Sequence, residues 1–425
     1  MKMCGIKSLS KFKISTAYLI IWMMMMIFFF HRFIIQFGAP DEVKYLLDFL
    51  NILLFLCAIN KKSCLNYKEK KYFFCYVLIF LLGTASALVN VVDWGWNVSC
   101  YFFDCRAIIR YIVFFYSCRV LLTNHMINKL FNWILGFHVI NSIYIVYQFF
   151  TLEVATYWMR GDNLNGFFGV ATGGNTYVNV LIIAVTLIIL NRWLKKECSL
   201  KSMLFFIGMN LAIATLIELK AYYIELLIIC AFFSFPYLKR FTSKQLVIGG
   251  CFICAGLITF VFLIQWLNKL YPWMKGTFTS IANIFMASSS YNNTGNIGRL
   301  SFLKDTYIQI FHKNIFDMIL GVGIGTASTS GEMTKFALTY YDKTHYSWLS
   351  SAYILVEMGI VGLSLYLYSF MLLFQCDKKN PWNQITKISC IISVILLIYN
   401  ETFRTEAGYI MFLLISLAYI KNDLV

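Results

Sequence analysis

Residues 321–362 read GVGIGTASTSGEMTKFALTYYDKTHYSWLSSAYILVEMGIVG and pass from a glycine-rich, polar segment into a long apolar one. Glycines stand at positions 321, 323 and 325, and His345 stands where the polar part ends. The apolar part carries Glu357 and is long enough to cross a bilayer as a helix. An ionisable side chain at the rim of such a helix is unusual, so we interpret the rest of the chain as scaffold around this rim.

Composition places the chain among membrane proteins. Of its 425 residues, 60% are hydrophobic and only 13% are charged, whereas soluble domains carry about 25% charged residues. Apolar runs of roughly 20 residues, the length that spans a bilayer, recur throughout. Backbone groups in lipid must be hydrogen-bonded within the chain, and the alternating pattern of a membrane barrel is missing. The sequence therefore predicts an all-α polytopic membrane protein.

About twelve membrane-spanning helices are predicted. Their approximate ranges are 14–36, 43–60, 72–92, 104–122, 130–151, 174–191, 202–218, 221–238, 245–267, 347–374, 385–401 and 406–420. The first range is too long for the apolar region of a signal peptide and lacks a small-residue cleavage site. Most Lys and Arg residues fall in alternate connections, which the positive-inside rule places in the cytoplasm together with both termini.

A long outer loop is predicted between the ninth and tenth spans. The chain then divides into spans 1–9 (residues 1–267), the loop (268–346) and spans 10–12 (347–425). Within the loop, GRLSFLKDTYIQIFHKNIFD (298–317) carries apolar residues at helical spacing, which predicts an amphipathic helix. These residues are Leu300, Leu303, Tyr307, Ile310, Phe311 and Ile315.

Charge and cysteine content exclude two other classes. The net charge of +16 lies in short clusters between apolar runs, and no nucleic-acid-binding motif accompanies it, so no nucleic-acid partner is expected. The 13 cysteines show no zinc-site spacing, and no metal or cofactor is expected. Cys100 and Cys105 lie in one predicted outer segment, where a disulfide and simple packing are both open.

The candidate site residues are mainly cations on the predicted outer side. Outside the open loop these are Arg32, Lys44, Arg106, Arg110, Arg160, Lys220 and Arg404. We select Arg160, Lys220 and Arg299 of the loop, because such a cluster suits a diphosphate at the headgroup level. The alternatives are solvated loop charges, or an ion pair of Lys220 with Glu218 or Glu225. His345 carries an imidazole, which suits proton acceptance, although a helix-end cap is the common role of a lone histidine.

Four stretches resemble the bacterial O-antigen ligase/polymerase superfamily. They are MRGDNLNGFFGVATGGNTYVNVL (159–181), TLIELKAYYIELL (215–227), GRLSFLKDTYIQIFHKNIFDMILGVGIGT (298–326) and HYSWLSSAYILVEMGIVGLSLYL (345–367). They resemble, in turn, the family's Arg-containing segment, its T-x-S-R turn, its R-x-x-x-W…G-x-G helix and loop, and its H-N-x-y-L…E-x-G segment. The chain departs from the pattern at Lys220, where the family commonly has arginine, and at Tyr346, where asparagine is usual.

The resemblance implies metal-independent glycosyl transfer on the outer face of the bacterial inner membrane, with undecaprenyl-diphosphate-linked oligosaccharide as donor. Arg160, Lys220 and Arg299 would hold the leaving diphosphate, and His345 would orient or deprotonate the attacking hydroxyl, with Arg299 and His345 as catalytic residues. Glu357 and Asn175 would support the site, although a structural role is favoured for Glu357. Membrane lipid, a chain-length regulator and a flippase are the further partners implied.

Three functions fit these expectations. An O-antigen polymerase leads, and an O-antigen ligase, which moves finished polymer onto lipid A core, shares its donor and differs in its acceptor. A transporter or flippase is the more distant alternative, because transporters place ionisable groups near the bilayer midplane and often contain repeats. Here the candidate charges gather on one side, and the two halves show no repeat.

Overall fold

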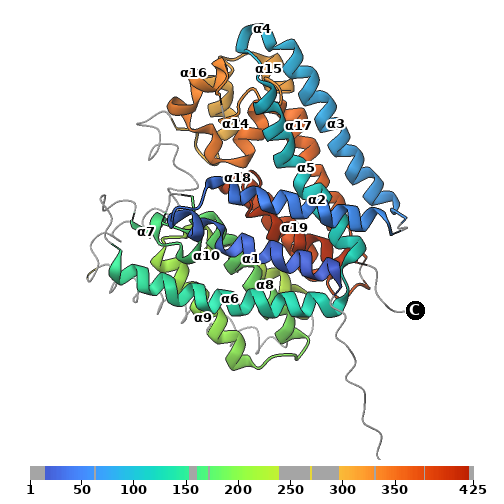
Figure 1. The fold of residues 1–425 in the computed structure, drawn as a ribbon, viewed down its shortest axis with the longest axis vertical. Coiled ribbons are helices and arrows are strands. Elements are labelled where there is room, and N and C mark those ends of the chain that lie inside the picture. Colours follow the sequence, from blue (N-terminus) through green and yellow to red (C-terminus); the bar gives the residue numbers. More distant parts are fainter. Residues whose placement is uncertain are drawn as a thin grey trace, which may run out of the picture.

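The chain forms a bundle of helices, seen in a computed structural model that describes residues 15–61, 64–152, 160–170, 173–238, 269, 296–329, 332–377 and 379–420. No strand occurs within these ranges. The longer helices are α1 (Thr16–Gln36), α2 (Tyr45–Ile59), α3 (Tyr67–Val89), α5 (Val98–Leu121), α6 (Asn124–Thr151), α8 (Asn175–Leu194), α9 (Leu200–Leu216), α10 (Lys220–Leu238), α17 (Ser350–Phe374), α18 (Asn383–Tyr399) and α19 (Gly408–Ser416) (Figure 1).

A helix occupies each predicted span within the described ranges, while the predicted span 245–267 lies outside them. Five of the described helices, α1, α3, α6, α8 and α17, are long and apolar enough to cross a membrane. Short elements connect the helices: η1 (Asp41–Lys44), α4 (Val91–Trp94), α7 (Arg160–Asn163), η3 (Gly166–Phe168), α14 (Phe302–Asp305), η5 (Thr306–Ile310), α15 (Ile315–Leu320), α16 (Lys335–Thr344), η6 (Tyr346–Trp348) and η7 (Leu417–Tyr419). The prediction of an all-helical membrane protein is confirmed.

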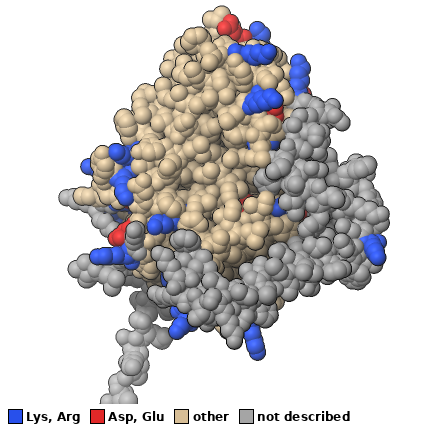
Figure 2. All heavy atoms as spheres, turned by 180° about the vertical axis from the view of Figure 1, so that it is seen from behind, with Lys and Arg blue, Asp and Glu red and all other residues tan. Residues whose placement is uncertain are grey.

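The outward faces of the helices are apolar, as expected for contact with lipid. On α2, Phe49, Ile52, Leu56 and Ile59 are each more than half exposed and recur at helical spacing along one side. In Figure 2 most of the visible described surface is uncharged, and Lys and Arg side chains gather toward its edges. A soluble protein rarely exposes an apolar surface of this kind.

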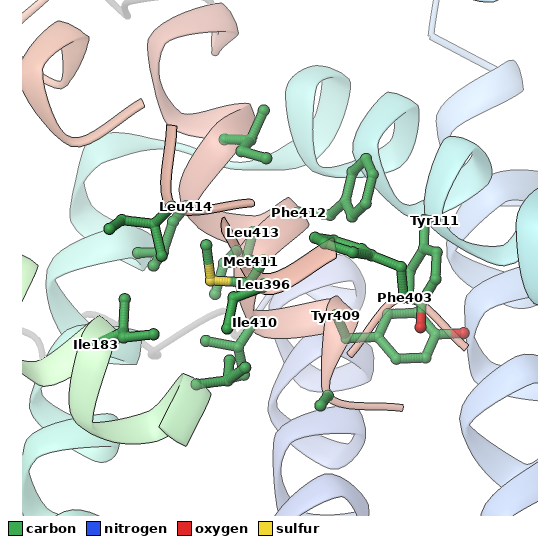
Figure 3. Packing of buried hydrophobic residues seen from close by; sticks show 14 of the residues in the cluster. Tyr111, Ile183, Leu396, Phe403, Tyr409, Ile410, Met411, Phe412, Leu413 and Leu414 are labelled. Atoms are coloured by element: carbon green, nitrogen blue, oxygen red, sulfur yellow. The ribbon is translucent and has the colours of Figure 1, made fainter. Parts of the chain in front are cut away.

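Helix α19 lies in the centre of the bundle and packs against α5, α8 and α18 (Figure 3). Its residues from Tyr409 to Leu414 are all buried. The Phe412 ring stacks on Tyr111 of α5, with 5.1 Å between ring centroids, and meets the edge of Phe403 at 6.0 Å. This packing fixes the connection between α18 and α19, residues 400–407, relative to the rest of the bundle.

Helix α17 is broken at Gly359, where φ is 63° and ψ is −170°. The break leaves carbonyl groups without helical partners, and the glycine-rich segment 321–325 supplies them. Val322 N–H donates to Val356 O and Gly323 N–H donates to Glu357 O, each at 2.8 Å. On its other side the segment contacts α3, since Ile324 N–H donates to Gly83 O at 3.1 Å. Segment 321–325 is thus buried between α3 and α17, where every backbone donor needs a partner.

The single amphipathic helix predicted over 298–317 is interrupted in the structure. The structure has α14 and η5, then a turn, then α15. His312 and Lys313 adopt positive φ values of 48° and 69°, which end the helix, and Asn314 caps the next one by accepting from Phe316 N–H. Leu300, Leu303 and Ile315, three of the apolar residues at helical spacing, are exposed, while Ile310 and Phe311 are buried.

Connections gather at two opposite ends of the bundle. At one, which we name the basic end, Lys68 Nζ donates to Gln375 O at 2.8 Å, and Lys195 Nζ lies 3.8 Å from the ring centroid of Trp382. The other, which we name the cavity end, holds connections 37–44, 160–174, 217–219 and 400–407. Figure 1 shows α7 at the left of the view. The described segments around Lys68, Asn124, Lys195 and Trp382, which belong to connections predicted to be cytoplasmic, lie at the basic end.

Cys100 and Cys105, one turn apart on α5, are free thiols, so the disulfide left open by their spacing does not form.

Glu69→Ala is expected to destabilise the basic end by about 3–5 kcal/mol, because it leaves a buried arginine unpaired. Glu69 and Arg119 are both almost fully buried and form a two-bonded pair, with Arg119 Nη2 at 3.0 Å from Glu69 Oε2. Unfolding in detergent, measured for Glu69→Ala, Arg119→Ala and the double variant, gives the coupling energy. Additive losses would show that the pair contributes nothing beyond its separate residues.

Candidate functional site

A cavity of about 470 Å³ opens at the cavity end of the bundle. Its walls come from the last turns of α1, from η1, from the start of α5, from η3 and α8, and from the 400–407 connection. The lining residues are His31, Arg32, Ile35, Gln36, Asp41, Lys44, Tyr45, Phe103, Arg106, Phe168, Gly169, Val170, Tyr177, Glu401, Arg404, Thr405 and Glu406. The first helix and the last connection of the bundle therefore meet in one site.

Arg32 lines this cavity together with Lys44, Arg106 and Arg404. Its guanidinium lies over Tyr177, with Cζ 4.5 Å from the ring centroid. The Nη1 atom is buried and has no hydrogen-bond partner among the described residues. A buried donor without a hydrogen-bond partner costs free energy of desolvation, so the geometry favours an acidic ligand at this point.

Arg404 reaches from the cavity toward the His345 segment. Its Nη1 donates to Ser347 O at 2.9 Å, and its Cζ lies 3.4 Å from the ring centroid of Tyr353. Behind it, Asp104 and Glu357 are buried carboxyl groups whose charges act on Arg404. This arginine therefore holds a fixed position in the cavity wall.

Glu406 is fully engaged by partners inside the protein. Arg110 Nη1 donates to its Oε1 at 3.0 Å, and the Tyr177 hydroxyl donates to its Oε2 at 2.6 Å. Burial opposes ionisation of Glu406, but Arg110 and the Tyr177 hydrogen bond outweigh burial and hold its pKa at about 2. Arg106 is placed nearby by Asp48, with Nε at 3.4 Å from Oδ2.

Of the predicted cluster of Arg160, Lys220 and Arg299, the structure describes the side chains of Lys220 and Arg299. Lys220 and Arg299 both lie within electrostatic range of Asp162 on α7, and Asn175 Nδ2 donates to Asp162 Oδ1 at 2.9 Å. Arg160 begins α7, and its side chain is outside the described part. The structure thus brings Lys220, Arg299 and Asn175 together around one carboxylate, and none of them lines the cavity.

Lys220 also acts on Glu218, its neighbour in the turn before α10. Burial raises the pKa of Glu218, and Lys220 opposes this shift. Arg299 is held from the other side, because its Nε donates to Tyr399 O at 3.1 Å and its Cζ lies 4.6 Å from the Tyr399 ring centroid. The ion-pair alternative for Lys220 therefore has a structural basis in Glu218, while Glu225 bonds to Asn179 instead.

His345 ends α16 in a left-handed conformation, with φ 47°. Its Nδ1 lies 2.7 Å from Asn296 Oδ1, and its ring lies 4.3 Å from that of Trp348, between centroids. Since the amide oxygen accepts, Nδ1 carries the proton and Nε2 is left as acceptor in the neutral ring. His345 is half-buried and does not line the cavity.

Glu357 is fully buried in α17, where its Oε1 accepts from Gly325 N–H at 2.8 Å. This bond fastens segment 321–325 to α17, which matches the structural role favoured for this residue. Among the described residues, no group of three His, Cys, Asp or Glu side chains has the arrangement of a metal site.

Sequence reasoning noted Arg32, Lys44, Arg106 and Arg404 as outer cations but did not select them. It missed Glu401 and Glu406, which it did not consider as chemical groups. The available signal was local: NETFRTEAG (400–408) places two glutamates and an arginine in a short connection between apolar runs. Comparison of the chain with protein-family models and with curated proteins finds no match.

Proposed function

We propose that the chain is a membrane glycosyltransferase that polymerises O-antigen or a related repeat-unit polysaccharide. The cation-lined cavity at one end of an apolar helical bundle is the observation that carries the proposal. The donor is an oligosaccharide on undecaprenyl diphosphate, and the acceptor is a sugar hydroxyl at the periplasmic face of the inner membrane. The four stretches that resemble the O-antigen ligase/polymerase superfamily support the same reading.

The cavity suits the diphosphate of such a donor. Arg32, Lys44, Arg106 and Arg404 face it, and the N–H groups of arginine match phosphate oxygens in geometry. As the sugar leaves, charge grows on the diphosphate, and fixed donors in a partly dry site stabilise that charge. Because Lys220 and Arg299 already face Asp162, we place the diphosphate in the cavity and assign Arg160, Lys220 and Arg299 to the rim, beside the carbohydrate.

The proposed topology has twelve spans, a long periplasmic loop before α17 and both termini in the cytoplasm. The gathering of basic connections at the end opposite the cavity supports it. The cavity then opens at the periplasmic surface, where lipid-linked donor and carbohydrate acceptor meet. A chain-length regulator and a flippase are the proposed protein partners.

Transport is a second candidate because of one buried group. Glu225 on α10 is fully buried, and its Oε1 accepts from Asn179 Nδ2 at 3.2 Å, whereas Oε2 has no partner among the described residues. Ionisable groups at membrane depth are common on ion pathways. The same group also serves as a polar contact between α8 and α10.

Deleting the gene is expected to remove the lipopolysaccharide ladder in the bacterial host while leaving a core-plus-one-unit band. A polymerase joins repeat units and is not needed to attach the first one. Loss of every O-antigen band, with polymer accumulating on the lipid carrier, would indicate the ligase instead. An unchanged ladder would refute both activities and direct attention to transport assays.

Complementation tests the residues. His345→Ala, which would remove a group that orients the acceptor hydroxyl, and Arg299→Ala, at the carbohydrate rim, are both expected to fail to restore the ladder. Lys335→Ala, at an exposed position of α16, serves as the control. Membrane abundance of each variant is measured by immunoblot. Full complementation by both variants would leave the activity standing and refute their assignment to the site.

A further inference from the structure

Two carboxylates line the cavity from the same connection, and they differ in what already binds them. Glu406 is bound by Arg110 and Tyr177. Glu401 is half-buried in the cavity wall, and no donor within the described ranges bonds its carboxylate or lies at ion-pair distance. One acidic group is thus committed to the protein, and the other is open to a ligand.

The backbone around Glu401 is fixed. Its carbonyl accepts from Arg404 N–H at 2.9 Å and from Thr405 N–H at 3.2 Å. The preceding residue, Asn400, accepts from Ser350 N–H at 2.9 Å through its carbonyl and from Thr402 N–H at 3.0 Å through its side chain. The side chain therefore projects from a rigid turn, which a catalytic group requires.

Gly173 gives the Glu401 carboxylate its room. A Cβ atom at Gly173 would lie 3.0 Å from Oε1, which is tighter than nine in ten real Cβ contacts. Gly173 also has φ +88°, which other residues rarely adopt. The predicted outer segment before α8 thus comes close to the Glu401 carboxylate at a glycine.

Four charged or titratable groups act on Glu401: Arg32 from α1, Tyr177 from α8, and Arg404 and Glu406 from its own connection. Burial raises the pKa of Glu401, Glu406 adds to the rise, and Arg404 and Arg32 oppose it. A carboxyl whose pKa lies above its ordinary range is a better proton acceptor near neutral pH once ionised.

We propose that Glu401 is the general base that takes the proton from the acceptor hydroxyl. This inference rests on the proposed function. The hydroxyl oxygen forms a bond to the anomeric carbon of the donor, and the bond from that carbon to the diphosphate oxygen breaks. Its electron pair leaves with undecaprenyl diphosphate, which Arg32 and Arg404 stabilise. The hydroxyl proton passes to a Glu401 oxygen and then to water.

His345 is the competing base. Its Nε2 is an acceptor, and Arg404 links its segment to the cavity through Ser347 O. Glu401, however, faces the same space as Arg32 and Arg404, whereas His345 does not line that space. The acceptor hydroxyl must lie beside the diphosphate to attack, which favours Glu401 over His345.

Glu401→Gln is expected to reduce turnover by roughly 10²–10⁴-fold, the usual contribution of a positioned base. The substrate is the undecaprenyl-diphosphate-linked repeat unit extracted from the deletion host, and product is measured by gel and mass spectrometry with purified protein. Binding of undecaprenyl diphosphate itself, followed by thermal shift, is expected to persist in Glu401→Gln, because only a carboxylate has been removed. Glu42→Gln, the same change at an exposed position of η1, is the control.

The pH profile separates a base from a structural residue. Wild-type turnover is expected to rise with pH as Glu401 loses its proton, and this limb is expected to vanish in Glu401→Gln. Glu401→Asp keeps the charge but withdraws it by one methylene, so a slower enzyme with the limb retained is expected. This second variant keeps the test valid if Glu401→Gln does not fold.

The outcomes are distinct. If the Glu401→Gln variant has the turnover and the pH profile of the wild type, the inference is overturned and the proposed function is left intact. Loss of diphosphate binding in Glu401→Gln also overturns it, because Glu401 then supports the site instead of accepting a proton. Wild-type protein that neither binds undecaprenyl diphosphate nor forms product overturns the proposed function and the inference together.

Discussion

Arg32→Gln is expected to lower the rate of polymer formation by roughly 10²–10³-fold, the loss seen when one fixed donor to a developing anion is removed. Arg32 presents a buried Nη1 with no partner among the described residues and lines the same cavity as Arg106 and Arg404. In the free protein this donor is unsatisfied, whereas a diphosphate oxygen would satisfy it. The variant therefore loses an interaction made with the ligand.

The stability of Arg32→Gln separates this role from a structural one. Its guanidinium packs on the Tyr177 ring, a contact worth about 0.5–2 kcal/mol, and its charge acts on Glu401, so the folded protein should survive with a modest loss of stability. Thermal unfolding in detergent and binding of undecaprenyl diphosphate are measured beside turnover. Arg192→Gln makes the same change at the basic-end terminus of α8, outside the cavity. This control is expected to leave diphosphate binding and turnover unchanged. A variant with normal binding and turnover would show that the cavity does not hold the diphosphate.

Gly323→Ala is expected to prevent accumulation of folded protein. Gly323 has φ +105°, and a Cβ there would overlap the backbone of Ala87 on α3, which cannot move aside as a side chain can. The backbone strain alone costs roughly 1–3 kcal/mol. Relief requires segment 321–325 to leave its position, which breaks the bonds to Val356, Glu357 and Gly83 and exposes Val322 and Ile324.

The combined cost of Gly323→Ala is large against a total stability of about 5–15 kcal/mol. Each buried hydrogen bond lost costs about 1 kcal/mol, and each buried aliphatic side chain exposed costs about 1.5–3 kcal/mol. Membrane abundance and size-exclusion profile in detergent provide the measurement. Gly208→Ala in α9, where a Cβ meets nothing within 4 Å, is the matched control and should be neutral or slightly stabilising. Equal behaviour of the two variants would contradict a packed segment 321–325.

The helices were predictable because length and hydropathy are local properties. A helix in lipid must form its backbone hydrogen bonds internally and must be apolar over about 20 residues. Apolar runs of that length are visible in the sequence. The break of the 298–317 helix was not predictable from spacing, because apolar periodicity carries no information about the positive φ values of His312 and Lys313. His312 contacts a residue distant in the sequence, since its Nε2 lies 2.7 Å from the Tyr340 hydroxyl of α16.

The cavity was predictable only in part, for a related reason. Arg32 and Arg404 were listed among the cations of the predicted outer side. Their position in one cavity depends on α1 and the 400–407 connection lying side by side, although these segments stand at opposite ends of the sequence. Glu401 was overlooked because outer acidic residues served only as markers of topology. No spacing rule connects it to Gly173, whose missing side chain makes the approach possible.

The cavity is lined by the first helix, α1, and by the late connection 400–407, and this has a consequence for biosynthesis. During translation, α1 enters the membrane with Arg32 long before residues 400–407 leave the ribosome. Until α18 and α19 are inserted, Arg32 has no opposing wall, and neither Arg404 nor Glu401 is present. A nascent or prematurely terminated chain thus lacks a complete cavity, and under the proposed function it would neither sequester scarce lipid carrier nor cleave its sugar in futile hydrolysis.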